Sequence, residues 1–419
     1  MMAPNMVIGL TGPFGSGCSE VAQILQSKRD YTVIRMSDIL RREAVENQGL
    51  ELPTGRAERR RLLTMVGREL RTSKGLDVLV KMALIEGSAA SSDGPVVLDG
   101  IKNHHEAAAI ASDTRGFVVA IDATDDTRWH RLEDEYEAGN RDLFDWDAEV
   151  DLDEGIEEGL STRKCMELAD VVIDNDFDWR DDDDRDEFAS VVDDYMRLVE
   201  DPGSREPTVP EIHMAEAYWA SRKSHCLSRK VGAVIVRQPT PEDDTEFLAE
   251  GHNHAPWRAG ECVEVYHDCY RRTMREEKLE ALSYCPRCRS EVSGGRCLNQ
   301  RCEFWKGRRD ILERSCTGRG LDLCRAVHAE EHAILRAISL TGTSLDGCTM
   351  YVTSHPCSWC AKSLVEVGIQ HVVYDEAYPM PEAQVLLDAA EISRIRFEGV
   401  KGEGFQSVFP GFQNEHPNP

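Results

Sequence analysis

His328-Ala329-Glu330 and, 26 positions after Glu330, Pro356-Cys357-Ser358-Trp359-Cys360 are the stretches that decide the fold of the second half of this sequence. Each stands where a helical pattern begins, at His328–Ser339 and at Ser358–Val367, with the strand-like run Thr349–Thr353 between them. One imidazole and two thiolates can hold a tetrahedral zinc ion and leave its fourth position open, which a catalytic site requires. The spacing therefore predicts a catalytic zinc on His328, Cys357 and Cys360.

Glu330 is the residue expected to move protons at this zinc, because it can stand beside the metal without binding it. Zinc lowers the pKa of a bound water from about 16 toward about 7. Glu330 would accept the proton of that water, protonate the ring nitrogen and then protonate the departing amino group, as the H-x-E and P-C-x-x-C signature of zinc deaminases implies. In the alternative interpretation, Cys357 and Cys360 form a structural zinc hook and His328 is an ordinary helix histidine. We expect His332, one turn later, to be a core or pocket-lining histidine and not a further ligand.

Length and composition set the broad class. With 419 residues, 41% hydrophobic and 30% charged, the sequence predicts two globular domains. It contains no apolar stretch long enough to span a membrane and no leader at its start, so we expect a cytoplasmic protein. The net charge of −27 argues against broad binding to DNA or RNA. Fourteen cysteines, twelve of them between Cys226 and Cys360, indicate metal ligands more than disulfides.

The first half opens with an apolar run, a glycine-rich turn and a helical pattern, which is typical of a nucleotide-binding α/β domain. Because strand-like runs then alternate with helical stretches, the sequence predicts a mainly parallel sheet. The strand-like runs are Val7–Leu10, Tyr31–Arg35, Pro95–Leu98, Phe117–Ile121 and Val171–Ile173, and the helical stretches include Arg56–Thr72 and Leu76–Ile85.

The glycine-rich turn, Gly12 to Ser19, fits the phosphate-binding loop G-x-x-x-x-G-K-[ST] except that Cys18 stands where lysine belongs. Its backbone N–H groups and the following helix N-terminus can still cradle phosphate. The missing ammonium is the group that steadies the β and γ phosphates, so we expect binding to survive where phosphoryl transfer does not. The expected nucleotide-binding residues are Gly12, Gly15, Gly17, Cys18, Ser19 and Asp99.

A cysteine-rich insertion at 262–322 interrupts the second half. Its two close cysteine pairs predict a closed structural zinc ribbon on Cys285, Cys288, Cys297 and Cys302. Four further cysteines and one histidine could form another metal site or help to complete the ribbon site, and it is equally open that the cysteines are free buried thiols. These residues are Cys262, His267, Cys269, Cys316 and Cys324. The insertion is basic, which suits either a solvated surface or a site for a triphosphate, for RNA or for an acidic face of another subunit.

From about Ile212 to Ile392 the sequence resembles the deoxycytidylate deaminase branch of the cytidine deaminase superfamily. The resemblance rests on Cys226 to Val234, Gly251-His252-Asn253, Cys324 to Ile334 and Pro356 to Cys360. It implies that Asn253 bonds the sugar or base and that Ser228 and Arg229 face the phosphate. Position 332 is usually Asn in such enzymes and is His here.

From about Met6 to Met196 the sequence resembles deoxynucleoside monophosphate kinases and dephospho-coenzyme A kinases, through Val96 to Asp99, Ser37 to Arg41, Asp126 to Arg131 and Ala169 to Asn175. The fold class is therefore α/β. We expect a P-loop kinase-like parallel-sheet domain at 1–200, a linker at 201–211, a cytidine-deaminase-like α/β/α domain at 212–395 with the zinc-ribbon insertion, and a C-terminal tail at 396–419, irregular from Gly402.

This combination resembles the bacterial anti-phage dCTP deaminase family. The resemblance implies conversion of dCTP and dCMP to uracil nucleotides, depletion of the dCTP that a phage needs, and a homo-oligomer. One alternative is a housekeeping dCMP deaminase whose N-terminal domain senses a nucleotide. Another is a cytosine editor of RNA or single-stranded DNA, against which the acidic charge argues. The N-terminal domain is also a candidate docking or sensing module for an inhibitory nucleotide or RNA.

Overall fold

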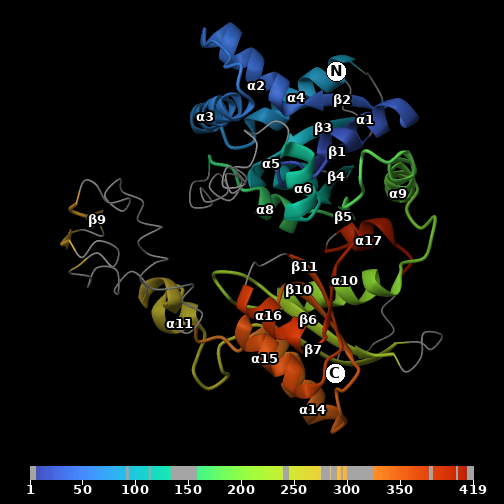
Figure 1. The fold of residues 1–419 in the computed structure, drawn as a ribbon, viewed down its shortest axis with the longest axis vertical. Helices are drawn as coiled ribbons and strands as arrows, with labels where there is room; N and C mark the ends of the chain where they lie inside the picture. Colours follow the sequence, from blue (N-terminus) through green and yellow to red (C-terminus); the bar gives the residue numbers. More distant parts are fainter. Residues whose placement is uncertain are drawn as a thin grey trace. The chain divides into compact units, whose positions relative to one another are not determined.

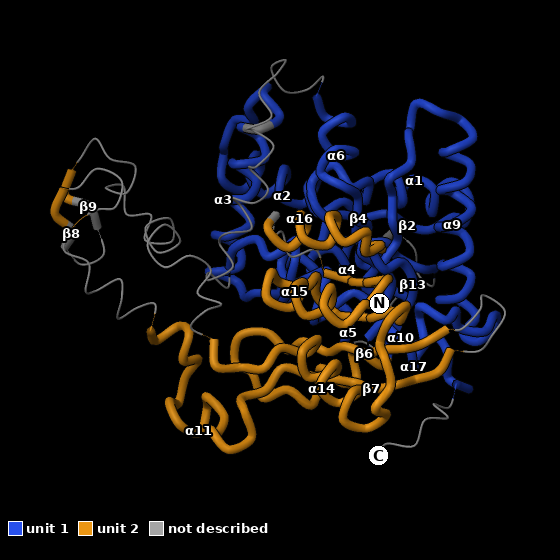
Figure 2. The backbone as a smooth tube through the Cα atoms, turned by 60° about the horizontal axis from the view of Figure 1, so that its bottom comes forward, with its two compact units in different colours: residues 1–215, 396–419 blue, residues 216–395 orange. Residues whose placement is uncertain are grey.

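A computed structural model describes residues 6–90, 94–112, 115–133, 158–238, 245–274, 284, 290–293, 296–299, 324–376, 381–402 and 404–412. The chain forms two compact units, which Figure 2 shows in different colours. Unit 1 comprises residues 1–215 and 396–419, and unit 2 comprises residues 216–395. No helix in the described ranges combines the length and apolar character that crossing a membrane requires.

Unit 1 is built on a six-stranded sheet in the order β13-β5-β4-β1-β3-β2. Its neighbouring strands are parallel except for β13, which runs antiparallel to β5. The strands are β1 Val7–Thr11, β2 Thr32–Arg35, β3 Val96–Ile101, β4 Gly116–Asp122, β5 Val171–Asp174 and β13 Gly399–Val400. The expected parallel sheet of the first half is confirmed.

Helices cover both faces of this sheet, as Figure 1 shows. One face packs against α1 and α9, while the other carries a hydrophobic core shared with α2, α3, α4, α5 and α8. The helical elements of unit 1 are α1 Cys18–Arg29, α2 Met36–Arg42, the π-helical turn η1 Glu43–Asn47, α3 Arg56–Lys74, α4 Val78–Ala90, α5 His104–Ala111, α6 Asp125–Leu132, α8 Thr162–Glu167, α9 Asp182–Glu200 and α17 Gly404–Val408. The strands read as continuous apolar runs because both of their faces are buried.

Unit 2 contains a five-stranded mixed sheet in the order β12-β11-β10-β6-β7. The pair β10–β11 is parallel, whereas β6 is antiparallel to both β10 and β7. Its elements are β6 Gly232–Arg237, β7 Glu246–His252, α11 Cys262–Tyr266, α14 Ala329–Thr341, β10 Thr349–Ser354, α15 Ser358–Val367, β11 His371–Glu376, α16 Pro381–Ala389 and β12 Ser393–Arg396. Helix α10, Val209–Arg222, crosses the boundary between the units.

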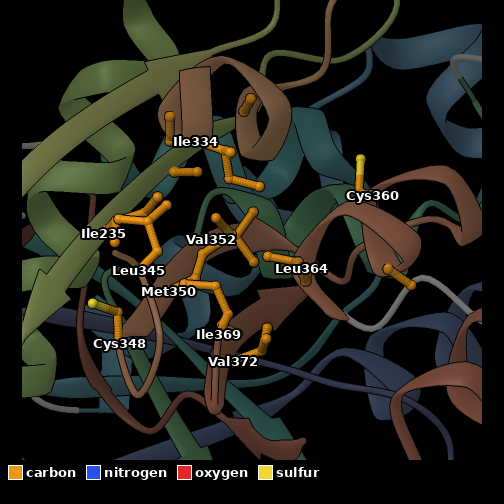
Figure 3. Packing of buried hydrophobic residues seen from close by; sticks show 14 of the residues in the cluster. Ile235, Ile334, Leu345, Cys348, Met350, Val352, Cys360, Leu364, Ile369 and Val372 are labelled. Atoms are coloured by element: carbon orange, nitrogen blue, oxygen red, sulfur yellow. The ribbon is translucent and has the colours of Figure 1, made fainter. Parts of the chain in front are cut away.

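The core of unit 2 lies between the sheet and α14, α15 and α16. Figure 3 shows strand residues Ile235, Met350, Val352 and Val372 among helix residues Ile334 and Leu364. On the other face, the glycine at position 232 lets α10 approach closely, because a Cβ there would lie 1.8 Å from the carbonyl oxygen of Ala217. The α/β fold class, with a parallel-sheet domain and a second α/β/α domain, is confirmed.

Two boundary expectations are wrong. The last three residues of the expected linker 201–211 belong to α10, and the Glu211 carboxylate is buried in a two-bond pair with the Arg205 guanidinium. The tail is not irregular throughout, because Gly404–Val408 form α17 and Phe405 is buried in unit 1. Glu211 also accepts a 3.0 Å hydrogen bond from the Val400 N–H, which is 189 positions away, and local composition does not reveal such a partner.

Candidate active site

The three expected zinc ligands meet at the N-termini of two helices in unit 2. His328 immediately precedes α14 and Cys357 immediately precedes α15, and neither side chain caps its own helix. The Nδ1 atom of His328 lies 3.4 Å from Sγ of Cys357 and 3.3 Å from Sγ of Cys360, and the two sulfurs are 3.5 Å apart. The structure thus brings together three side chains that are up to 32 positions apart in the sequence.

This donor set fits zinc. With Zn–S bonds of about 2.3 Å and Zn–N bonds of about 2.0 Å, tetrahedral coordination separates the ligand atoms by roughly 3.5–3.8 Å, slightly more than the separations found here. Among the described residues, this is one of two groups whose donor atoms lie close enough together to hold a metal ion. Three ligands leave one coordination position for another molecule.

The ligand atoms also compete for protons. Hydrogen bonds to Cys324 and Cys357 raise the pKa of His328 to about 11. The hydrogen bond with Cys360, together with His328, lowers the pKa of Cys357 to about 4. Zinc binds a neutral imidazole and a thiolate, so a metal ion at this position has to displace the proton of His328.

Glu330 lies in the first turn of α14 beside this cluster and is only 4% exposed. Burial raises the pKa of its carboxyl, while the neighbouring His328 acts in the opposite direction. The Cys360 thiol and the Glu330 carboxyl each affect the pKa of the other group, which indicates that the two lie close together. A carboxylate in this position is close enough to exchange protons with a molecule held at the three ligands.

Close contact between β7 and α14 positions the start of the helix. A Cβ on Gly251 would lie 2.2 Å from the carbonyl oxygen of Ala329 and 2.4 Å from the backbone nitrogen of Ala333. Only a residue without a side chain permits this approach. Gly251 therefore helps to set the position of His328 and Glu330 over the sheet.

The expected substrate residues lie on the segment 228–231 and at the end of β7. The Asn253 side chain is buried, accepts a 2.9 Å hydrogen bond from the Val231 N–H and donates at 2.8 Å to the Arg229 carbonyl. Ser228 accepts a hydrogen bond from Arg271 at 2.9 Å. An amide and a hydroxyl retain further bonding capacity in these arrangements, and the substrate roles of Ser228, Arg229 and Asn253 stay predictions.

Two hydrogen-bond acceptors near Arg229 were not predicted from the sequence. Nη1 of Arg229 lies 3.2 Å from Oγ of Ser354 and 3.2 Å from Oε2 of Glu376. Ser354 and Glu376 are register partners at the carboxyl ends of the parallel strands β10 and β11. Polar residues at neighbouring carboxyl ends are the signal that could have indicated them, because such ends share one edge of a sheet.

In unit 1 the glycine-rich turn forms a loop between β1 and α1. Gly17 has φ of 107°, and a Cβ there would lie 2.3 Å from Nδ2 of Asn175, so the loop requires glycine at this position. Burial raises the pKa of the Cys18 thiol to about 11, which keeps it uncharged near neutral pH. Ser19 donates to the Asp99 carboxylate at 2.9 Å. The loop and Asp99 are thus brought together as expected from the motif.

A lysine outside the Gly12–Ser19 motif lies at this loop. Lys102, immediately after β3, donates a hydrogen bond to the Gly12 carbonyl, and its charge acts on Cys18 and Asp99. The guanidinium of Arg131 stacks on Trp179 at 3.9 Å and lies 3.3 Å from the Gly15 carbonyl. The order β1-β3 in the sheet was the missing information, because it places the end of β3 beside the loop.

The loop borders a cavity of about 880 Å³ in unit 1. Cationic side chains line it together with the carboxylates of Glu20, Asp99 and Glu106 and with apolar groups. The cationic residues are Arg41, Arg56, Arg59, Arg60, Arg71, Lys102 and Arg131. Arg71 is engaged with the buried carboxylate of Glu106 at 2.8 Å. Arg41 is paired with the Asp38 carboxylate at 2.6 Å, and the seven cations still outnumber the three carboxylates of the lining, which makes the cavity suited to an anion.

Three of the four expected ligands of the zinc ribbon lie outside the residues that the structure describes. Cys285, Cys288 and Cys302 lie outside the described residues. Cys297 belongs to the short strand β9, Arg296–Cys297, which pairs antiparallel with β8, Val292–Ser293. The second zinc site stays a prediction.

Comparison with known proteins connects this geometry to a family. Residues 208–376 match the cytidine and deoxycytidylate deaminase zinc-binding region, and residues 8–150 match an AAA domain. ComE operon protein 2 of Bacillus subtilis is 43% identical over 185 residues, which are 44% of this chain and 68% of that protein. The deoxycytidylate deaminase of Enterobacteria phage T4 is 30% identical over 167 residues, 39% of this chain and 75% of the relative.

The deoxycytidylate deaminase of Schizosaccharomyces pombe is 28% identical over 194 residues, 46% of this chain, and the match spans only 44% of that protein. The matches to these relatives thus cover less than half of this chain and unequal shares of the relatives. The residues that match the family's zinc-binding region, 208–376, include His328, Glu330, Cys357 and Cys360. The chain belongs to the cytidine and deoxycytidylate deaminase family.

Proposed function

We propose that the protein hydrolytically deaminates deoxycytidine nucleotides, dCTP and dCMP, to the corresponding uracil nucleotides. The observation that carries the proposal is the convergence of His328 Nδ1 and the Cys357 and Cys360 sulfurs within 3.5 Å of one another beside the buried Glu330. The names of the relatives support deoxycytidylate as a substrate. The proposal that dCTP is also a substrate rests on the resemblance of the two-domain arrangement to the anti-phage dCTP deaminase family.

The proposed chemistry divides between the metal and the chain. Zinc held by His328, Cys357 and Cys360 supplies the Lewis acidity that lets water attack near neutral pH. Glu330 accepts one proton from the attacking water and donates it to the pyrimidine ring nitrogen. It then accepts the second proton of that water from the hydroxyl now bonded to the ring carbon and donates it to the amino group, so that the carbon–nitrogen bond breaks, the carbonyl forms and ammonia leaves. Its burial excludes bulk water from the carboxyl, so that the proton passes between carboxyl and substrate.

The phosphate and sugar are proposed to lie toward Asn253, Ser228 and Arg229. Asn253 ties the segment that bears the other two residues to the end of β7 through two backbone hydrogen bonds. Arg229 is already paired with Glu376 at 3.2 Å. A phosphate near Arg229 would have to compete with that carboxylate for the guanidinium.

For unit 1 we propose nucleotide binding without phosphoryl transfer. The P-loop glycines, Ser19 and Asp99 would hold the phosphates and a counter-ion, and the cationic cavity would accommodate the rest of the anion. Depletion of dCTP during phage infection, a homo-oligomeric assembly and an inhibitory nucleotide or RNA are proposals that follow from the resemblance. A housekeeping dCMP deaminase with a nucleotide-sensing N-terminal unit is the alternative.

The test is a panel of cytosine nucleotides incubated with the zinc-loaded full-length protein and assayed for ammonia and uracil product. Glu330→Ala is the inactive control, and Glu331→Ala, on the exposed side of the same turn, is the matched control that should retain activity. Release of ammonia from dCTP supports the triphosphate proposal. Turnover of dCMP alone favours the housekeeping alternative, and no turnover of either nucleotide contradicts the proposed function.

A further inference from the structure

Three histidines form a second cluster in unit 2, apart from the residues assigned to the catalytic zinc. His252 ends β7, His254 follows it by two positions, and His332 lies in the second turn of α14. Their ring centroids are 5.3 Å apart for His252–His254, 4.9 Å for His252–His332 and 4.3 Å for His254–His332. One ring nitrogen from each lies within 4.8 Å of the others.

The hydrogen bonds around the rings resemble the outer shell of a metal site. Nδ1 of His254 and Nδ1 of His332 each lie 3.1 Å from the same backbone carbonyl oxygen, that of His252. Metal-bound imidazoles commonly donate their other N–H to such a carbonyl, which leaves Nε2 unprotonated. Nδ1 of His332 is also 3.2 Å from the His252 backbone nitrogen, so a metal would select the tautomer that donates to the carbonyl.

The third ring supplies an unpaired nitrogen. Nδ1 of His252 is buried and has no hydrogen-bond partner among the described residues. A buried ring nitrogen without a partner is costly unless another group binds it. The nearby Glu250 carboxylate is engaged by Lys223 and lies 3.6 Å from Arg336, so it does not complete the cluster as a counter-charge for an imidazolium.

Protonation alone does not account for the arrangement. Three imidazolium rings at these separations would repel one another, so the rings have to be mostly neutral. Neutral imidazole is the preferred ligand of zinc, copper and nickel ions, while magnesium and calcium prefer oxygen. The cluster therefore offers three nitrogen donors of one chemical class and a position for water or another ligand.

We propose that His252, His254 and His332 form a second metal site. The site binds one divalent transition-metal ion, which we expect to be zinc, and its protein ligands are nitrogen atoms only. The ion would join the end of β7 to α14. Asn253 lies between two of its ligands, and α14 begins just after His328, so the ion would brace the strand end and the helix that flank the proposed catalytic centre. Its role is structural, and no step of the deamination is assigned to it.

Metal content tests the proposal in the full-length protein. His254→Gln and His332→Asn should each lower the zinc bound per chain by about one equivalent relative to wild type. His130→Gln removes an exposed imidazole of α6 in unit 1 and should leave the zinc content unchanged. Equal zinc content in wild type and both cluster variants would overturn the proposal.

Cobalt substitution separates this site from the sites that contain cysteine. The spectrum of the Co²⁺-loaded wild-type protein minus that of His254→Gln should show ligand-field bands without a thiolate-to-cobalt charge-transfer band. The charge-transfer band from Cys357 and Cys360 should persist in the variant, which shows that unit 2 remains folded. If all cobalt bound by the wild-type protein is accounted for by thiolate-containing sites, the three-histidine site does not exist. The result is independent of deaminase turnover, and either proposal can fail without the other.

Discussion

The proposed zinc centre of unit 2 and the glycine-rich loop of unit 1 both lie where a helix begins, but their charged groups come from different kinds of sequence neighbour. In unit 2, the proposed ligands and the proposed proton shuttle all come from two short motifs, at 328–330 and 357–360. In unit 1, the motif has Cys18 in place of lysine, and Lys102, immediately after β3, is one of the cations that contact the loop. The motifs of unit 2 contain every group that the proposed chemistry needs. The loop motif of unit 1 lacks its lysine, and a lysine from a neighbouring strand of the sheet contacts the loop.

The largest expected effect lies at the complete motif. Glu330→Gln should keep the shape of the side chain but remove proton transfer, and we expect kcat to fall by about 10²- to 10⁴-fold. Zinc content should remain that of the wild type, because the carboxyl is not one of the three ligands. Ammonia release from dCMP and dCTP measures the change, with Glu331→Gln as the matched control. Activity within a few-fold of wild type would remove Glu330 from the mechanism.

Loss of a ligand should be nearly as severe but act through the metal. Cys357→Ser replaces a thiolate with a poor zinc ligand, so zinc and activity should be lost together. Elemental analysis after dialysis against a chelator and the ammonia assay measure the two quantities on the same sample. Cys226→Ser, a cysteine outside the cluster, should behave as wild type. Full zinc retention in the Cys357 variant would mean that the three side chains do not form the site.

At the broken motif the expected effect is smaller. Lys102→Met should weaken binding of inorganic tripolyphosphate or ATP to unit 1 by about tenfold, the size of one charge-assisted hydrogen bond. Cys18→Lys added to this variant should recover affinity, because it returns an ammonium group to the loop from its usual position. Calorimetric titration of the full-length protein measures both effects.

Lys81→Met, an exposed lysine of α4, is the control for the change in net charge. Unchanged affinity in the Lys102 variant, or no recovery with Cys18→Lys, would show that Lys102 does not replace the missing lysine.

The smallest expected effect is on stability and concerns Glu398, in the C-terminal segment 396–419 of unit 1. Burial, followed by repulsion from Asp174, raises the pKa of Glu398 to about 7. Because the folded-state pKa exceeds the unfolded value, the stability contributed by the neutral carboxyl is present below about pH 4.5 and is lost as the pH rises through about 7. Glu398→Gln stays neutral and should raise stability above pH 7 by about 1 kcal/mol, allowing for solvent screening of this part-exposed group.

Urea unfolding at pH 8 and at pH 5 measures this difference, which should shrink at the lower pH. Glu187→Gln, exposed on α9 of the same unit, should show no such dependence. A larger gain at pH 5 than at pH 8 would contradict the assigned direction of the pKa shift.

Much of the fold could be predicted from local pattern. Helix α15 begins and ends at the predicted Ser358 and Val367, and the strand predicted at Val171–Ile173 is β5 with one further residue. These segments have a buried stripe or a continuous apolar run, which are signals that reside in neighbouring residues. The two-residue strand β13 has no such signal, since it exists only through its pairing with β5.

Sequence alone determined the ligand types at the proposed catalytic centre, because three ligands and an acid occur in two motifs whose spacing suits the chemistry. Tertiary structure alone decided that Lys102 lies at the glycine-rich loop, that the buried Glu211 accepts a hydrogen bond from the Val400 N–H, and that three histidines meet beside α14. The physical reason is that these groups come from elements distant in the chain. Their proximity depends on strand order and helix packing, which no local pattern records.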